Sequence, residues 1–171
     1  MNQNKTLQDK ITSALEHFSN GRIKETLFII EALIKDYPDE SKLFNISGAC
    51  YVQKGELDTA VKYYEKSIII NPEYAEAHFN LAKALQEKKL FESSIISYKK
   101  ALKIKPQYAE AHNNLGGVFQ ELGRLEDASK CYESAILINP NYAAALYSLG
   151  KVFQSLGKLK DAVKNLNKVL E

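Results

Sequence analysis

The sequence predicts an all-α fold made of stacked antiparallel helix pairs, in about five repeats of 34 residues. Three observations support this fold class. All four prolines of the 171-residue chain are 34 residues apart, at Pro38, Pro72, Pro106 and Pro140. Glycine and alanine columns recur with the same period, and the apolar residues between them follow helical spacing. A period of about 20 to 50 residues indicates units that bury their apolar faces only by stacking on one another.

We expect each repeat to form two helices. The fourth repeat shows the pattern most clearly: apolar residues between Ala111 and Leu122 follow helical spacing, Gly123 ends that helix, and the spacing resumes between Leu125 and Ile136. Applied along the chain, this pattern gives repeats at 7–40, 41–74, 75–108, 109–142 and, incompletely, 143–171.

The first repeat is expected to begin with a capped helix. Thr6 followed by Asp9 has the spacing of a capping box, in which each side chain satisfies the other's backbone N–H. Lys10 stands where the second repeat has Phe44, so this repeat has the character of an N-terminal end.

The turns inside the repeats depend on glycine. A residue just beyond a helix end commonly takes the left-handed conformation, which disfavours any side chain with a Cβ. Four repeats have glycine at this position, namely Gly21, Gly55, Gly123 and Gly157, whereas the third has Lys89. The proline ends the second helix because it lacks a backbone N–H donor and biases the residue before it away from the helical region.

The chain resembles the tetratricopeptide-repeat family. The resemblance rests on the 34-residue helix-turn-helix and on the residues that recur in it, which in the fourth repeat are Leu115, Gly116, Phe119, Gly123, Ala128, Tyr132, Ala135 and Pro140. It covers Leu7 to Glu171 and implies a right-handed α-solenoid in which residues 1–171 form a single array.

Two segments resemble a narrower group of repeats. Residues 74–81 and 108–116 are similar to the repeats that precede the catalytic region of O-linked N-acetylglucosamine transferases, and to repeats of bacterial proteins of the same family. In those transferases asparagines line the superhelix.

Composition argues against a membrane protein or a disulfide-bonded one. No apolar run approaches the roughly 18 residues that a membrane helix needs. Residues 1–6 lack the basic and then apolar pattern of a secretory signal, so we expect a cytoplasmic location. Cys50 and Cys131 lie in different repeats without a near partner, which argues against a disulfide framework or a zinc site.

The sequence offers no catalytic, cofactor or nucleic-acid motif. His78 and His112 occupy the same place in adjacent repeats, but a metal would need further ligands, and we expect both to fill the family's aromatic position. The charges form no stripe of one sign; the lysines from Lys99 to Lys105 are expected to be a solvated face. We therefore predict no metal site, no cofactor, no catalysis and no nucleic-acid partner.

The resemblance implies a binding groove lined by the first helices of the repeats. The positions carried over from the family include amide residues, which both donate and accept hydrogen bonds and can pair with a peptide backbone. Of these, Gln86, Gln120 and Gln154 form one row and Asn80 and Asn114 another, continued by Ser148. Phe79 and Tyr147 are expected to add apolar grip, with Gly117 leaving room between them. The whole predicted set is Asn45, Phe79, Asn80, Lys83, Gln86, Asn113, Asn114, Gly117, Gln120, Tyr147, Lys151 and Gln154. An equally good interpretation of the glutamine row is that duplication copied ordinary exposed residues.

These observations predict a non-catalytic module that binds a protein or an extended peptide. Two alternatives stay open: the substrate-docking N-terminal region of a larger enzyme such as a glycosyltransferase, and a self-associating scaffold. Both follow from Glu171, which closes the second helix of the last repeat short of a full period. Solenoid ends usually need a polar cap. Lys164, Asn165, Asn167 and Lys168 make that helix partly polar, so we expect either a further domain after Glu171 or self-association through this helix.

Overall fold

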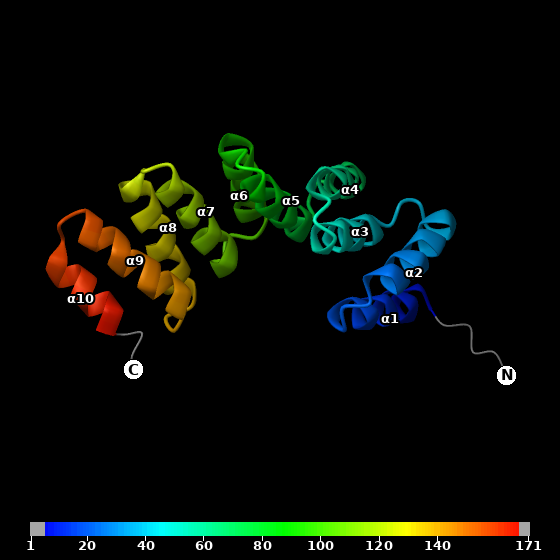
Figure 1. Ribbon diagram of the computed structural model, residues 1–171, viewed down its shortest axis with the longest axis horizontal. Coiled ribbons are helices and arrows are strands. Elements are labelled where there is room, and N and C mark those ends of the chain that lie inside the picture. Colours follow the sequence, from blue (N-terminus) through cyan, green and yellow to red (C-terminus); the bar gives the residue numbers. More distant parts are fainter. Residues whose placement is uncertain (1–5, 168–171) are drawn as a thin grey trace. The chain divides into compact units, whose positions relative to one another are not determined.

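Helices account for all the regular structure in the part of the chain that the computed structural model describes, which is residues 6–167 except for the side chain of Lys164 (Figure 1). The first helices of the pairs are α1 (Leu7–Ser19), α3 (Ser41–Gln53), α5 (Ala75–Glu87), α7 (Ala109–Glu121) and α9 (Ala143–Ser155). The second helices are α2 (Ile23–Asp36), α4 (Leu57–Ile70), α6 (Phe91–Ile104), α8 (Leu125–Ile138) and α10 (Leu159–Asn167). The predicted all-α class and the pairing of helices are confirmed.

The chain divides into two compact units that meet within α5, between Ala84 and Leu85. The first unit holds α1 to α4, and the second holds α6 to α10. Each is described by itself below. That residues 1–171 form one array with the repeat boundaries given above stays a prediction.

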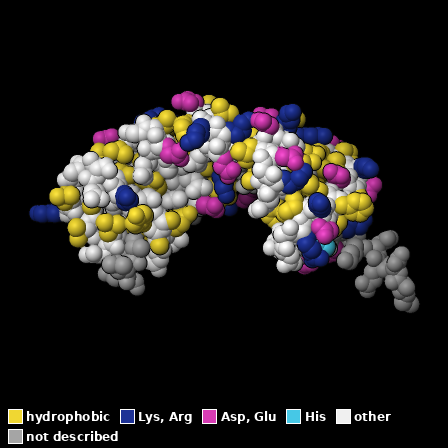
Figure 2. Space-filling view, viewed as in Figure 1, with side chains coloured by type: hydrophobic (Ala, Val, Ile, Leu, Met, Phe, Trp, Pro, Cys, Tyr) yellow, Lys and Arg dark blue, Asp and Glu magenta, His cyan; other side chains and the backbone are white. Residues whose placement is uncertain are grey.

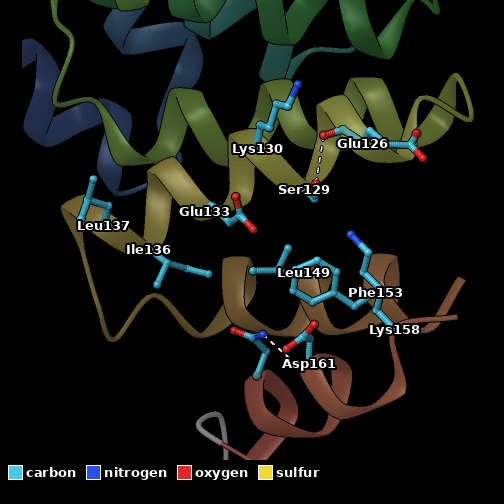
Figure 3. A pocket seen from close by; sticks show the side chains of 11 residues that line it. Glu126, Ser129, Lys130, Glu133, Ile136, Leu137, Leu149, Phe153, Lys158 and Asp161 are labelled. Carbon is cyan, nitrogen blue, oxygen red and sulfur yellow. Dashed lines mark hydrogen bonds between the residues drawn. The ribbon is translucent and has the colours of Figure 1, made fainter. Parts of the chain in front are cut away.

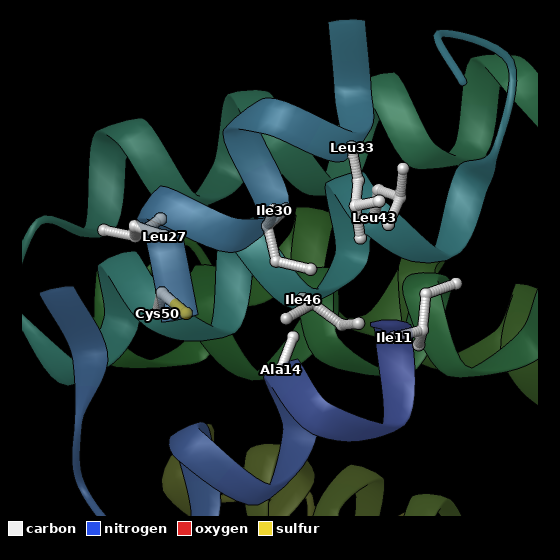
Figure 4. Packing of buried hydrophobic residues seen from close by; sticks show 8 residues of the cluster. All are labelled: Ile11, Ala14, Leu27, Ile30, Leu33, Leu43, Ile46 and Cys50. Atoms are coloured by element: carbon white, nitrogen blue, oxygen red, sulfur yellow. The ribbon is translucent and has the colours of Figure 1, made fainter. Parts of the chain in front are cut away.

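The first unit has its core where α1, α2 and α3 meet (Figure 4). The sequence builds this core from one apolar face on each helix: Ile11 and Ala14 of α1, Leu27, Ile30 and Leu33 of α2, and Leu43, Ile46 and Cys50 of α3. At the start of α1 the predicted capping box is confirmed. Asp9 N donates to Thr6 Oγ1 at 3.2 Å, and Thr6 N donates to Asp9 Oδ2 at 3.0 Å.

The second unit is organised around α7, which packs on α6, α8 and α9, while α10 covers α9. Close approach of paired helices depends on small residues at one position. A Cβ added to Gly116 would lie 2.8 Å from the ring of Tyr132, and one added to Gly150 would lie 2.7 Å from Leu166. The first unit repeats the arrangement, with Gly48 against Tyr64. These glycines are required by packing and not by backbone conformation.

The glycines at the turns are required by backbone conformation. Gly21, Gly55, Gly123 and Gly157 have φ between 72° and 76°, as predicted for residues that end a helix in the left-handed conformation. Lys89 adopts the same conformation with φ of 58° although it carries a side chain. The turn geometry is therefore kept in the third repeat at the expense of local strain.

The two equivalent histidines join successive repeats. His78 Nε2 lies 2.9 Å from the carbonyl oxygen of Pro72, and His112 Nε2 lies 3.0 Å from that of Pro106. A ring N–H can donate to each carbonyl, which lies just past the end of the preceding helix. These contacts give both histidines a structural role.

The expectations about the C-terminal end fall mostly outside the described residues. Glu171 and Lys168 lie beyond them, as does the side chain of Lys164. Asn165 Nδ2 donates to the carbonyl oxygen of Asp161 at 2.9 Å, and Asn167 is exposed, so these two polar residues lie within or at the end of α10.

Candidate binding surface on the first helices

The predicted groove residues of the first unit pair with each other. Asn80 Nδ2 donates to Asn45 Oδ1 at 3.0 Å, and the Asn45 side chain also hydrogen-bonds Tyr74. Lys83 Nζ lies 5.6 Å from the centroid of the Phe79 ring, a cation–π contact. Phe79 differs from the expectation that it grips a ligand, because its side chain is only 4% exposed. Of these residues, Lys83 is the exposed one.

In the second unit two glutamines of the predicted row are held by tyrosines. Tyr98 Oη donates to Gln86 Oε1 at 3.1 Å, and Tyr132 Oη donates to Gln120 Oε1 at 2.9 Å. Both pairs join residues 12 apart, from the first helix of a repeat to the second helix of the same repeat. Sequence reasoning missed this link, although the tyrosine and glutamine columns keep that spacing. In both pairs the amide oxygen of the glutamine faces the tyrosine hydroxyl.

The same tyrosines reach the next repeat. The side chain of Asn114 hydrogen-bonds Tyr98, and that of Ser148 hydrogen-bonds Tyr132. Burial raises the pKa of both tyrosines, and these hydrogen bonds only partly oppose the rise. The phenols therefore stay neutral and donate at neutral pH. Asn114 thus takes part in repeat packing as well as in any groove.

The remaining hydrogen bonds show which amide groups are engaged. Gln86 Nε2 donates to Glu121 Oε1 at 2.9 Å, so both ends of this amide have partners. Asn113 Nδ2 donates to Asn114 Oδ1 at 3.2 Å, while Asn113 Oδ1 is buried without a hydrogen-bond partner. Gln120 has its oxygen engaged by Tyr132, and its NH₂ group makes no hydrogen bond within the described part of the chain.

Gly117 lies beside these amides on α7. A Cβ added there would meet Gln86 Nε2 and Tyr132 Oη, both at 3.9 Å, which is ordinary van der Waals contact. The neighbouring Gly116 has no such space. The backbone of α7 is therefore bare at residue 117 although the packing leaves room for a side chain.

The predicted residues of α9 are open to solvent. Tyr147 is 52% exposed, with Lys151 Nζ at 6.0 Å from the centroid of its ring. This pair stands two repeats after Phe79 and Lys83, at the same positions. Gln154 is exposed and has no tyrosine to hold it, because Leu166 stands where the fourth repeat has Tyr132.

The described residues show no cluster that points to other chemistry. Among them, no group of three or more histidine, cysteine or acidic side chains could hold a metal ion. Figure 2 shows side chains of both charges interspersed with hydrophobic ones on the face in view. Of the helices described, none is long and apolar enough to cross a membrane.

Family models match most of the chain. A model described as TPR repeat matches residues 48–89, 91–123 and 118–157, and a model described as tetratricopeptide repeat matches 144–171. The chain belongs to the tetratricopeptide-repeat family. Both models describe repeats, and a repeat array of this family offers an extended surface to protein partners. No curated protein matches the chain.

Solved structures of other family members have the same fold. The crystal structure of MamA is 23% identical, over 98% of this chain and 95% of that one, with a TM-score of 0.84. PilF from Pseudomonas aeruginosa is 15% identical, over 95% of this chain and 74% of that one, with a TM-score of 0.90. YrrB, described as a TPR protein with an unusual peptide-binding site, is 18% identical over 99% and 87%, with a TM-score of 0.76. At these identities the likeness shows the fold.

Proposed function

We propose that this tetratricopeptide-repeat chain is a non-catalytic interaction module that holds an extended peptide segment of a protein partner along α7 and α9. The observation that carries the proposal is Gly117. Glycine inside a helix is less stable than alanine by about 1 kcal/mol, and the structure around Gly117 accepts a Cβ at 3.9 Å. A bare helix backbone here allows a ligand to approach more closely than any side chain would permit.

The amide of Gln120 supports the same surface. Tyr132 holds its oxygen, so the NH₂ group is left to donate. A backbone carbonyl of an extended peptide is an acceptor that every peptide offers, whatever its sequence. A donor that is already oriented binds such a carbonyl with little loss of side-chain entropy.

Tyr147 and Lys151 supply the apolar contact and the charge. The Tyr147 ring is half exposed, and aromatic rings give a large contact area at binding surfaces for little conformational entropy. Lys151 Nζ lies 6.0 Å from the centroid of that ring and places a positive charge beside it. YrrB, which has the same fold, is described as having a peptide-binding site, and this is consistent with the proposal.

The proposal is tested by selecting peptides from a displayed random library and measuring their affinity for the purified chain. We expect Gln120→Ala and Tyr147→Ala each to weaken binding about tenfold, which corresponds to the loss of about 1.4 kcal/mol. Lys99→Ala on α6, an exposed residue outside the proposed surface, is the matched control and should bind as the wild type does. Peptides that bind all three variants and the wild type equally would place the site elsewhere and contradict the proposal.

A further inference from the structure

A pocket of about 730 Å³ lies among α8, α9 and α10, apart from the residues just discussed (Figure 3). Ile136 and Leu137 of α8 and Leu149 and Phe153 of α9 form its apolar part. Charged and polar side chains surround this part: Glu126, Ser129, Lys130, Glu133, Lys158, Asp161 and Asn165. The volume lies within the range of pockets that bind small molecules.

The first unit shows what fills the same place in another repeat. Three periods before Phe153 stands Tyr51, and three periods before Asn165 stands Tyr63. The rings of Tyr51 and Tyr63 stack, with centroids 5.2 Å apart and planes 14° from parallel. Leu27, which corresponds to Ser129, is buried in the core of the first unit. At α2, α3 and α4 the chain therefore fills this place with its own aromatic and aliphatic side chains.

The place one period earlier, at α6, α7 and α8, gives a second comparison. One period before Ser129 and Asn165 stand Ile95 and Cys131, and both are half-buried. At the pocket the two positions instead hold a short hydroxyl and an amide that are satisfied locally. Ser129 Oγ donates to the carbonyl oxygen of Glu126 at 2.9 Å, and Asn165 donates to that of Asp161 at 2.9 Å. Ser129 is shorter than Leu27 and Ile95 at the same position, and Asn165 lacks the ring that Tyr63 supplies in the first unit.

The geometry points to a tyrosine side chain of a protein partner as the occupant, which we propose stacks on Phe153 as Tyr63 stacks on Tyr51. Phe153 supplies the ring, and Leu149 and Ile136 supply the apolar surface around it. Offset stacking of two rings is favourable at centroid separations of about 4.5 to 7 Å.

Glu133 lines the pocket and offers a carboxylate to the hydroxyl of the incoming tyrosine. Glu31 holds this position in the first unit, where it lies close enough to Tyr63 to add to the rise in pKa that burial mainly causes there. A carboxylate accepts a hydrogen bond from a phenol more strongly than a neutral group does. Tyrosine is therefore favoured over phenylalanine and over leucine.

The test uses N-acetyl-tyrosine amide as the probe, titrated into the purified chain while the methyl signals of Ile136 and Leu149 are followed by NMR. We expect saturable shifts with a dissociation constant of about 1 mM, typical of so small a ligand. N-acetyl-leucine amide should bind at least fivefold more weakly. Lys99→Ala, on α6 and outside both surfaces, should bind the probe as the wild type does.

Asn165→Tyr is the decisive variant, because it gives α10 the residue that α4 has at this position. We expect the folded variant to bind the probe at least tenfold more weakly. Ser129→Leu, which copies Leu27, should have the same effect and serves if Asn165→Tyr does not fold. Absent shifts at Ile136 and Leu149, equal binding of the two probes, or unchanged binding by a folded filled variant would each overturn the proposal.

Discussion

Helix α7 carries two adjacent glycines whose surroundings differ. On the side that faces α8, a Cβ at Gly116 would lie 2.8 Å from the Tyr132 ring. At the next residue, a Cβ at Gly117 would meet its nearest atoms, Gln86 Nε2 and Tyr132 Oη, at 3.9 Å. The first glycine is explained by the repeat, since Gly48 and Gly150 stand at the same position with the same close contact. The second is not explained by packing, and it lies beside the amides proposed to bind a ligand.

The comparison shows how a repeat separates stability from function. One face of the helix is copied from repeat to repeat because every pair of helices must approach closely. The other face varies, with Ala49, Lys83, Gly117 and Lys151 at the position of Gly117 in successive repeats. Changes on the first face should act mainly on folding, and changes on the second mainly on binding.

The largest expected effect comes from the same substitution at both glycines. Gly116→Leu should lower the free energy of unfolding by about 3 kcal/mol, because the new side chain overpacks against Tyr132. Gly117→Leu should keep it within about 1 kcal/mol of the wild-type value, since a helix-forming residue replaces glycine where there is room for its Cβ. Urea unfolding of the two variants measures the difference. Equal losses of unfolding free energy would show that the Gly116 and Gly117 positions do not differ in packing.

The second expected effect is a loss of folding stability at alkaline pH, where buried thiols and phenols lose their protons. Burial raises the pKa of the Cys50 and Cys131 thiols to about 11, from 9.0, and raises that of Tyr98 and Tyr132. The folded chain then holds protons that the unfolded chain releases, so stability is full below about pH 9 and falls as pH rises through the folded values. Urea midpoints between pH 7 and 11 measure this. A free energy of unfolding that rises between pH 7 and 11 would contradict the raised pKa values of these buried groups.

The hydroxyl of Tyr132 makes a smaller contribution. Tyr132→Phe keeps the ring against Gly116 but removes the hydrogen bonds to Gln120 and Ser148, and should lower the free energy of unfolding by about 1 kcal/mol. Tyr147→Phe removes a hydroxyl that makes no hydrogen bond among the described residues, and is the control. A Tyr132→Phe variant as stable as that control would show that the tyrosine does not hold Gln120.

The smallest expected effect concerns a turn, where glycine is needed for backbone conformation. Lys89 has φ of 58° where four other repeats have glycine. Lys89→Gly should raise the free energy of unfolding by about 0.5 to 1 kcal/mol, since relief of the left-handed strain exceeds the added flexibility of glycine. Thermal and urea unfolding would detect the gain, and a loss would mean that the Lys89 side chain stabilises the turn.

Local chemistry made much of the fold predictable from the sequence. The box formed by Thr6 and Asp9, the glycine turns and the proline-terminated helices each depend on residues a few positions apart. The bonds from Tyr98 to Gln86 and from Tyr132 to Gln120 could not be read in this way, because the columns alone do not show which side chains point toward each other.

The exposure of single site residues could not be predicted from their position in the repeat. Phe79 occupies a groove position, yet its ring is buried, whereas Tyr147 at the equivalent position is half exposed. The same repeat position thus meets different surroundings in different repeats. The pocket at Phe153 likewise depends on Ser129 and Asn165, whose effect appears only when the neighbouring helices are in place.

The most direct test of the account is Gly117→Ala, measured for both unfolding free energy and affinity for a selected peptide. Alanine fits the space at 3.9 Å and favours the helix, so stability should rise by about 1 kcal/mol. The added methyl group occupies the surface proposed for the ligand, so affinity should fall about tenfold. A more stable variant that binds the peptide as tightly as the wild type would contradict the claim that this face of α7 is kept bare for a partner.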